Sequence, residues 1–162
     1  MRWRIIDNFE MTDGHLVSLA RSHQDDGKFV LAGFSNGHVR VVDTKAGHLV
    51  HILSMRESPD LVVAAGGWIV ASCFFAPISF TCWDLEDGRA IHRFDQTCVG
   101  WEEITTLAGI CPTKHKNSFA LWDGRASIRI LDVSTGRFSR VVEARGLFNA
   151  SIRRGVYAEA EV

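Results

Sequence analysis

The stretch FVLAGFSNGHVRVVDTKAGHLVHILS, residues 29–54, consists of three apolar segments separated by two turns. The first turn contains Asn36 and Gly37, and the second ends at Gly47. Between them, apolar and polar residues alternate up to Asp43. Alternation with a period of two residues is typical of a strand, and short Gly-containing turns are typical of hairpins. The stretch therefore predicts three consecutive antiparallel strands.

The same pattern returns over residues 68–94 and 118–142. In all three copies the middle segment ends in Asp, and Gly follows four residues later; the Asp residues are Asp43, Asp84 and Asp132. A further apolar run precedes each copy and supplies an inner strand, at residues 16–20, 61–65 and 104–108. The Asp residues are 41 and 48 positions apart, near the period of about 40–50 residues of β-propeller blades.

We therefore expect an all-β protein, a partial or small β-propeller of three to four blades, each a four-stranded antiparallel sheet. It would form a single domain over residues 1–162, with blades at about residues 15–54, 60–95 and 103–143. Two arrangements stay open for the end segments 1–10 and 146–162. They complement each other as a shared fourth blade, or the ring is incomplete and relies on a second copy, a partner or further chain. Prolines fall at predicted loop positions: Pro59, Pro77 and Pro112.

Several residue pairs resemble the dipeptides that mark the start and the end of a repeat in the WD-repeat family. Gly14-His15 precedes the first inner strand, and Trp83-Asp84 is the family's own dipeptide, with relaxed versions at Val42-Asp43 and Leu131-Asp132. The resemblance covers about residues 14–142. It implies that His15 braces a blade and that Trp83 is structural. The equivalent places of Asp43, Asp84 and Asp132 indicate turn-stabilising hydrogen bonds to nearby backbone amides.

In this family the loops between the second and third strands, and those between blades, form the rim at which ligands dock. Aromatic and Arg side chains there are of the types enriched at binding hot spots. The candidate protein-binding residues are Phe34, His38, Arg56, Phe75, Trp101 and Arg125. The alternative interpretation is that aromatic side chains of these loops fill the gaps between blades.

The sequence contains little that indicates a catalytic or a metal-binding site. His48 and His51 are three residues apart, a spacing that places them on opposite faces of a strand rather than at one metal. None of the four cysteines belongs to a C-x-x-C pair; they are Cys73, Cys82, Cys98 and Cys111. No potential nucleophile has a base at a spacing typical of a catalytic site. We expect no catalytic site, no metal and no cofactor.

Charge and hydropathy limit the classes of partner that the chain is expected to bind. The formal net charge is −1, and no run approaches the roughly 18 apolar residues of a membrane span. Seven Arg lie between residues 125 and 154, against two acidic residues, which would suit an acidic partner or protect an exposed strand edge. Nucleic acid is not expected as a partner, and neither is a membrane. Free thiols and the absence of a secretory signal favour a cytoplasmic or nuclear location.

These observations favour a non-catalytic scaffold that binds other proteins through rim loops and blade edges. One alternative is a quinoprotein-like, cofactor-binding propeller. Its repeats end the outer strand in a docking Trp, whereas this chain has Leu53, Phe94 and Val141 or Val142 in those places. Another alternative is a truncated copy of a longer WD-repeat protein without independent activity.

Overall fold

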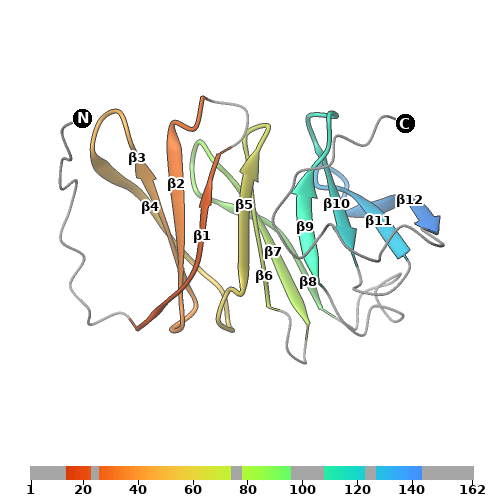
Figure 1. Cartoon of the computed structure of the whole chain (residues 1–162), viewed down its shortest axis with the longest axis horizontal. Coiled ribbons are helices and arrows are strands. Elements are labelled where there is room, and N and C mark those ends of the chain that lie inside the picture. Colours follow the sequence, from red (N-terminus) through yellow and green to blue (C-terminus); the bar gives the residue numbers. More distant parts are fainter. Residues whose placement is uncertain (1–13, 23–25, 74–77, 96–107, 123–126, 144–162) are drawn as a thin grey trace, which may run out of the picture.

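The computed structural model describes residues 14–22, 26–73, 78–95, 108–122 and 127–143. Within these ranges the regular secondary structure is β-strand throughout, which confirms the all-β prediction. The strands form three sheets, each of four antiparallel strands in sequence order (Figure 1). We refer to the sheets as blades 1, 2 and 3.

Blade 1 consists of β1 (Leu16–Arg21), β2 (Phe29–Phe34), β3 (His38–Asp43) and β4 (His48–Ser54). The turn from β2 to β3 is tight because Gly37 adopts a φ of +86° and the Asn36 side chain accepts a hydrogen bond from the His38 amide at 3.1 Å. Apolar and polar residues alternate along β3 as the sequence pattern predicts, but burial does not: every residue after His38 is buried, including Arg40.

The other two blades repeat this order. Blade 2 consists of β5 (Leu61–Ala65), β6 (Trp68–Cys73), β7 (Ser79–Asp84) and β8 (Ala90–Asp95). Blade 3 consists of β9 (Gly109–Pro112), β10 (Ser118–Trp122), β11 (Ser127–Asp132) and β12 (Arg137–Glu143). The first strands β1, β5 and β9 lie next to one another, and the remaining strands follow outward in each blade.

The described first strand of blade 3 is β9, and Pro112 ends this strand instead of lying in a loop as predicted. The run at residues 104–108, which was predicted to supply the inner strand, lies outside the described residues except for Ala108. Pairing with β10 fixes this register, because Cys111 lies opposite Ala120 and Pro112 opposite Phe119. A proline is tolerated there since β9 is an edge strand.

The blades pack face to face, and β7 shows how. Its side chains point alternately to the two neighbouring blades. Phe80 and Cys82 belong to the core shared with blade 3, whereas Trp83 belongs to the core shared with blade 1. Phe80 is 1% exposed and Trp83 2% exposed, so each buries a large apolar area worth about 2–3 kcal/mol.

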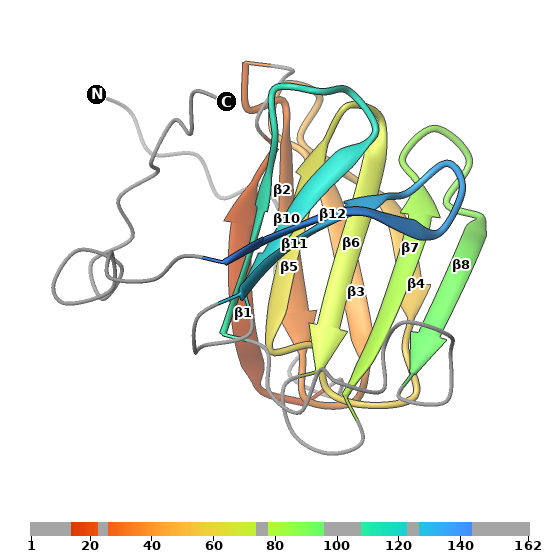
Figure 2. The same cartoon turned by 90° about the vertical axis from the view of Figure 1, so that its right-hand side faces the viewer.

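A register shift recurs at the same place in every described blade. It falls between the third and fourth strands, at Val41/Val42, at Cys82/Trp83 and at Ile130/Leu131. An extra residue in one strand increases the local twist. In blade 3 the twist is seen in Figure 2, where β11 and β12 run obliquely to the strands of blade 2.

Candidate protein-binding surfaces

Three of the predicted binding residues meet at one corner of blade 1. Phe34 ends β2 and His38 begins β3, on the two sides of the same turn. His38 pairs with Ser54, and the chain reaches Arg56 two residues later. Arg56 is exposed and His38 is half-buried. We call Asn36, His38 and Arg56 the rim corner.

The segment that carries Arg56 is fixed at both ends. The Met55 amide donates a hydrogen bond to the Gly37 carbonyl oxygen at 2.8 Å. On the other side, the Ser79 hydroxyl donates to the Glu57 carboxylate at 2.8 Å, which ties the segment to blade 2. Arg56 is thus displayed between two anchored neighbours, on a connection that bridges two blades.

Phe34 does not project into solvent as an anchor. It is 9% exposed, and the guanidinium carbon of the equally buried Arg40 lies 5.2 Å from its ring centroid. Stacking of this kind stabilises a buried cation over an aromatic ring. Phe34 is thus buried within blade 1 and belongs to neither of the two cores between the described blades. Phe75, Trp101 and Arg125 lie outside the described residues.

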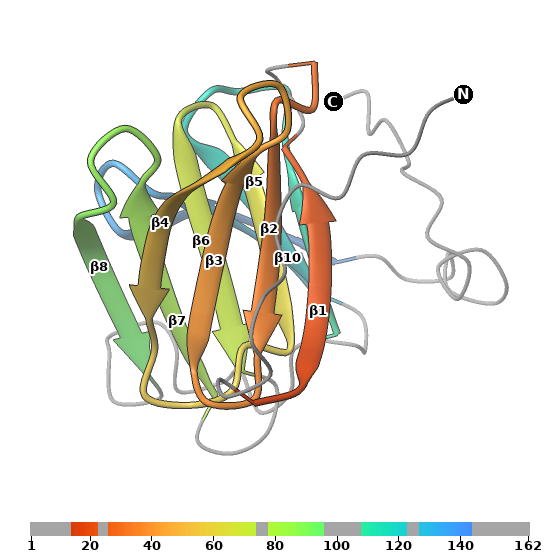
Figure 3. The ribbon, with the colours of Figure 1, turned by 90° about the vertical axis from the view of Figure 1, so that its left-hand side faces the viewer.

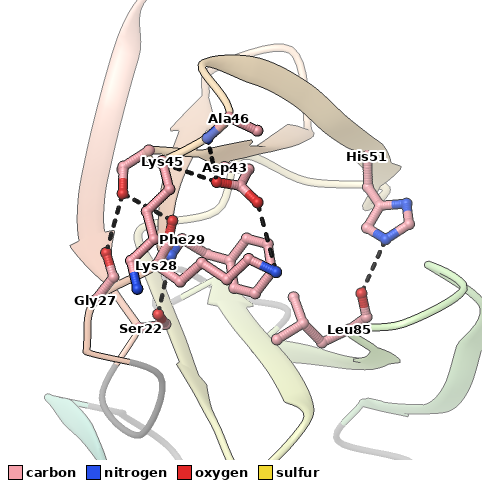
Figure 4. Close-up of polar contacts among 10 residues, drawn as sticks. Ser22, Gly27, Lys28, Phe29, Asp43, Lys45, Ala46, His51 and Leu85 are labelled. Atoms are coloured by element: carbon pink, nitrogen blue, oxygen red, sulfur yellow. Dashed lines mark hydrogen bonds and ion pairs between the residues drawn. The ribbon is translucent and has the colours of Figure 1, made fainter.

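The three repeated Asp residues hold the turns at the opposite rim. Asp43 accepts hydrogen bonds from the amides of Lys45 and Ala46, both at 2.8 Å, and pairs with Lys28 at 3.5 Å (Figure 4). Asp84 accepts one from the Glu86 amide at 2.7 Å. The contact with the Ala46 amide comes first among the interactions that lower the pKa of Asp43 below its usual range.

Asp132 makes the fullest set of these contacts. It accepts hydrogen bonds from the Ser134 hydroxyl at 2.6 Å, the Ser134 amide at 2.9 Å and the Thr135 amide at 3.1 Å. The Ser134 hydroxyl is the strongest influence that lowers the pKa of Asp132. All three turns close on a Gly with positive φ, whose amide donates to the carbonyl oxygen of the Asp: Gly47, Gly88 and Gly136.

His15 and Trp83 occupy different environments. The backbone amide of His15 donates to the Ser35 hydroxyl at 2.9 Å, and its carbonyl oxygen accepts from the Ser35 amide, whereas the residue itself is exposed. His15 therefore contacts the turn between β2 and β3 through its backbone. Trp83 is buried between blades 1 and 2.

Sequence reasoning missed a contact between blades. The His51 Nε2 atom donates to the Leu85 carbonyl oxygen at 2.9 Å, which joins β4 of blade 1 to the turn of blade 2 (Figure 4). A Cβ atom at Gly88 would lie 2.8 Å from His51 Nδ1, so the ring covers this glycine closely. His92 lies in the same way against Gly136. The sequence does contain an indication of these contacts, because both histidines lie eight residues after the repeated Asp.

Blades 2 and 3 are joined at the same rim by Trp68. Its indole nitrogen donates to the Asn117 side-chain oxygen at 3.0 Å. The two contacts, His51 to Leu85 and Trp68 to Asn117, bring polar anchors to both blade boundaries in the described part of the chain.

Solved structures with the same arrangement of blades identify the fold. The WD40 repeats of RRP9 superpose with a TM-score of 0.62 at 8% sequence identity, over 86% of this chain and 41% of that one. The described residues form three blades of a β-propeller fold. The likeness at this identity concerns the fold, and the chain spans about two fifths of the length of that relative.

Two further structures resemble this propeller. BamB from Moraxella catarrhalis gives a TM-score of 0.63 at 12% identity, over 82% of this chain and 38% of that one. The computationally designed Ika4 protein gives a TM-score of 0.62 at 14% identity, over 88% of this chain and 81% of that one. No protein-family model and no curated protein matches the sequence.

The described part of the propeller contains no cluster of three or more His, Cys, Asp or Glu side chains able to hold a metal ion. Nor does it contain a helix long and apolar enough to cross a membrane. Cys73 and Cys82 are buried cysteines outside any disulfide, and burial raises the pKa of Cys82 to about 12. Cys111 is exposed, yet neighbouring atoms desolvate its thiol enough to raise its pKa.

Proposed function

We propose that this propeller is a non-catalytic scaffold that binds other proteins, with the rim corner as one contact surface. The observation that carries the proposal is the display of Arg56 on a segment tied to Gly37 on one side and to blade 2 on the other. Arginine is enriched at binding hot spots, and a surface already held in place loses less conformational entropy on binding.

The proposed partners are other proteins, among them a second copy of the chain or a chain that completes the propeller. Nucleic acid and membranes are not among them. The proposed location is cytoplasmic or nuclear, in keeping with Cys73 and Cys82, which form no disulfide.

A capture experiment with three matched baits tests this role. Tagged wild-type protein is compared with Arg56→Ala and with Lys45→Ala, which removes the same charge from an exposed residue in the turn at the other end of β3. Proteins recovered by the baits are quantified by mass spectrometry, and each specific one is purified and titrated calorimetrically. We expect Arg56→Ala to weaken binding about tenfold or more, equal to about 1.4 kcal/mol, and Lys45→Ala to leave it unchanged.

Equal recovery of every protein by wild-type and Arg56→Ala baits would remove the rim corner from the proposal. An ultraviolet–visible spectrum of the purified protein addresses the quinoprotein-like alternative. Absorbance from a bound quinone would contradict the non-catalytic scaffold itself.

A further inference from the structure

Each outer blade has one face that lies away from the core it shares with blade 2. On blade 3, Leu121 and Leu131 point into the core with blade 2, so their strand neighbours point away from it. Pairing places five of these neighbours side by side, and we call them the leading face: Cys111, Ala120, Trp122, Ile128 and Ile130.

Blade 1 presents the second face, seen from outside in Figure 3. Leu31, Val39 and Val41 point into the core with blade 2, so the residues between them point away. Together with their cross-strand partners they form the trailing face: Leu16, Leu19, Ala32, Phe34, Arg40, Val42 and Ile52. Leu16 is 56% exposed, Leu19 66% and Ile52 54%, whereas the other four members of this face are buried. In the described residues every exposed large hydrophobic side chain lies on blade 1.

From these faces we infer that a second copy of this chain docks head to tail, with the leading face of one copy on the trailing face of the other. This inference specifies one protein partner of the scaffold proposed above, namely a second copy of the chain, and it rests on the proposed function in that respect alone.

The internal repeat carries the argument. In blade 1, Val39 and Val41 stand four and two residues before the repeated Asp and pack onto blade 2. In blade 2 the same places hold Phe80 and Cys82, which pack onto blade 3. In blade 3 they hold Ile128 and Ile130 of the leading face. The leading face is thus the third copy of a surface that twice packs onto a following blade.

The trailing face is the matching half. Trp83 and Leu131 directly precede their Asp, and each packs onto the blade before it. Val42 has the same place on the trailing face. One chain therefore carries both halves of an interface that occurs twice within it. A head-to-tail contact between different surfaces either closes into a ring or extends into a polymer. Two copies that close would cover the exposed Leu16, Leu19 and Ile52 of each.

The inner strands specify which residues should meet. Ala20 of β1 packs in the core that contains Val62 of β5, and these two strands are adjacent. By register, Cys111 holds the place of Ala20, and Leu19 holds the place of Val62. The native thiol of one copy should therefore lie near Leu19 of the other.

The first experiment measures mass by light scattering across a dilution series. We expect twice the mass of one chain for wild type. Leu19→Asp on the trailing face and Ile128→Asp on the leading face should each weaken association at least tenfold, whereas the exposed Lys45→Asp should not. Mixing the two face variants should restore association in part, because one interface in the mixed pair joins two unaltered faces.

The second experiment is chemical cross-linking, which remains decisive if Ile128→Asp unfolds. A short bismaleimide should join Leu19→Cys to Cys111 of another copy, as mapped by peptide mass spectrometry, while Lys45→Cys should yield no such link. A wild-type monomer at all concentrations overturns the inference in favour of the chain's own ends or another protein as the occupant. Unchanged association of a folded Ile128→Asp overturns the head-to-tail arrangement. Neither result touches the rim corner, which Arg56→Ala tests separately.

Discussion

Replacing Gly88 by alanine should lower the free energy of unfolding by about 2–3 kcal/mol, whereas the same change at Gly67 should lower it by about 1 kcal/mol. Both glycines have positive φ, +71° and +85°, so both substitutions strain the backbone to a similar degree. They differ in their surroundings. A Cβ atom at Gly67 would meet nothing within 4 Å, whereas one at Gly88 would lie 2.8 Å from His51.

The added loss at Gly88 comes from the neighbouring blade. To accommodate the methyl group the His51 ring must move, and its 2.9 Å hydrogen bond to the Leu85 carbonyl oxygen is then lost or distorted. A hydrogen bond of this kind contributes about 1 kcal/mol, and the displaced ring also gives up packing contacts. The difference between the two variants is therefore the strength of one contact between blades 1 and 2.

Urea denaturation followed by circular dichroism measures the free energy of unfolding of both variants. In thermal unfolding, each kcal/mol corresponds to about 2–4 °C in Tm for a chain of this size. Adding His51→Ala completes a cycle. Once the ring is gone, Gly88→Ala should cost only the backbone strain, as Gly67→Ala does. If Gly88→Ala is no more destabilising than Gly67→Ala in the wild-type background, the contact between the blades contributes nothing and the reasoning is refuted.

Three further predictions concern the core and the ionisable groups. Phe80→Ala should destabilise the protein by about 3–5 kcal/mol in urea denaturation, because it empties the core between blades 2 and 3; a loss below 1 kcal/mol would contradict that packing. Since the folded-state pKa of Asp132 is lowered, its contribution to stability is present above about pH 4 and disappears as the pH falls through the folded pKa. Asp132→Asn should therefore have a flatter stability profile between pH 5 and about pH 2, and a slope equal to wild type would contradict this. In native protein at pH 8, iodoacetamide should label Cys111 faster than Cys82, whose pKa is about 12, as peptide mass spectrometry would show; equal rates would contradict the burial of Cys82.

The blade repeat could be predicted from the sequence because its signals are local. The alternation before Asp43 and the glycine four residues after it determine strand, turn and strand without reference to the rest of the molecule. The register of β9 could not be predicted in this way. It depends on pairing with β10, which places Cys111 opposite Ala120 and Pro112 opposite Phe119.

The candidate site was less predictable, since burial depends on which face a residue occupies. Phe34 was predicted as a binding residue from its place in a loop, but it shares a face with Arg40, which stacks on its ring. The contact of His51 with Leu85 depends on how two blades are placed relative to each other, and neither residue is unusual in its own segment. Only comparison of the repeats, with His92 in the equivalent place, could have indicated it.

The alternating side chains of β7 have a consequence for local opening of the chain. Blade 2 contributes to both cores, whereas each outer blade contributes to one. In repeat architectures, the stability of each unit is approximately its own plus that of the boundaries it shares. In the monomeric chain, amide hydrogens of β6 and β7 should therefore exchange with solvent more slowly than those of β2 and β10. The central blade is thus the unit around which the others order, and the last to open.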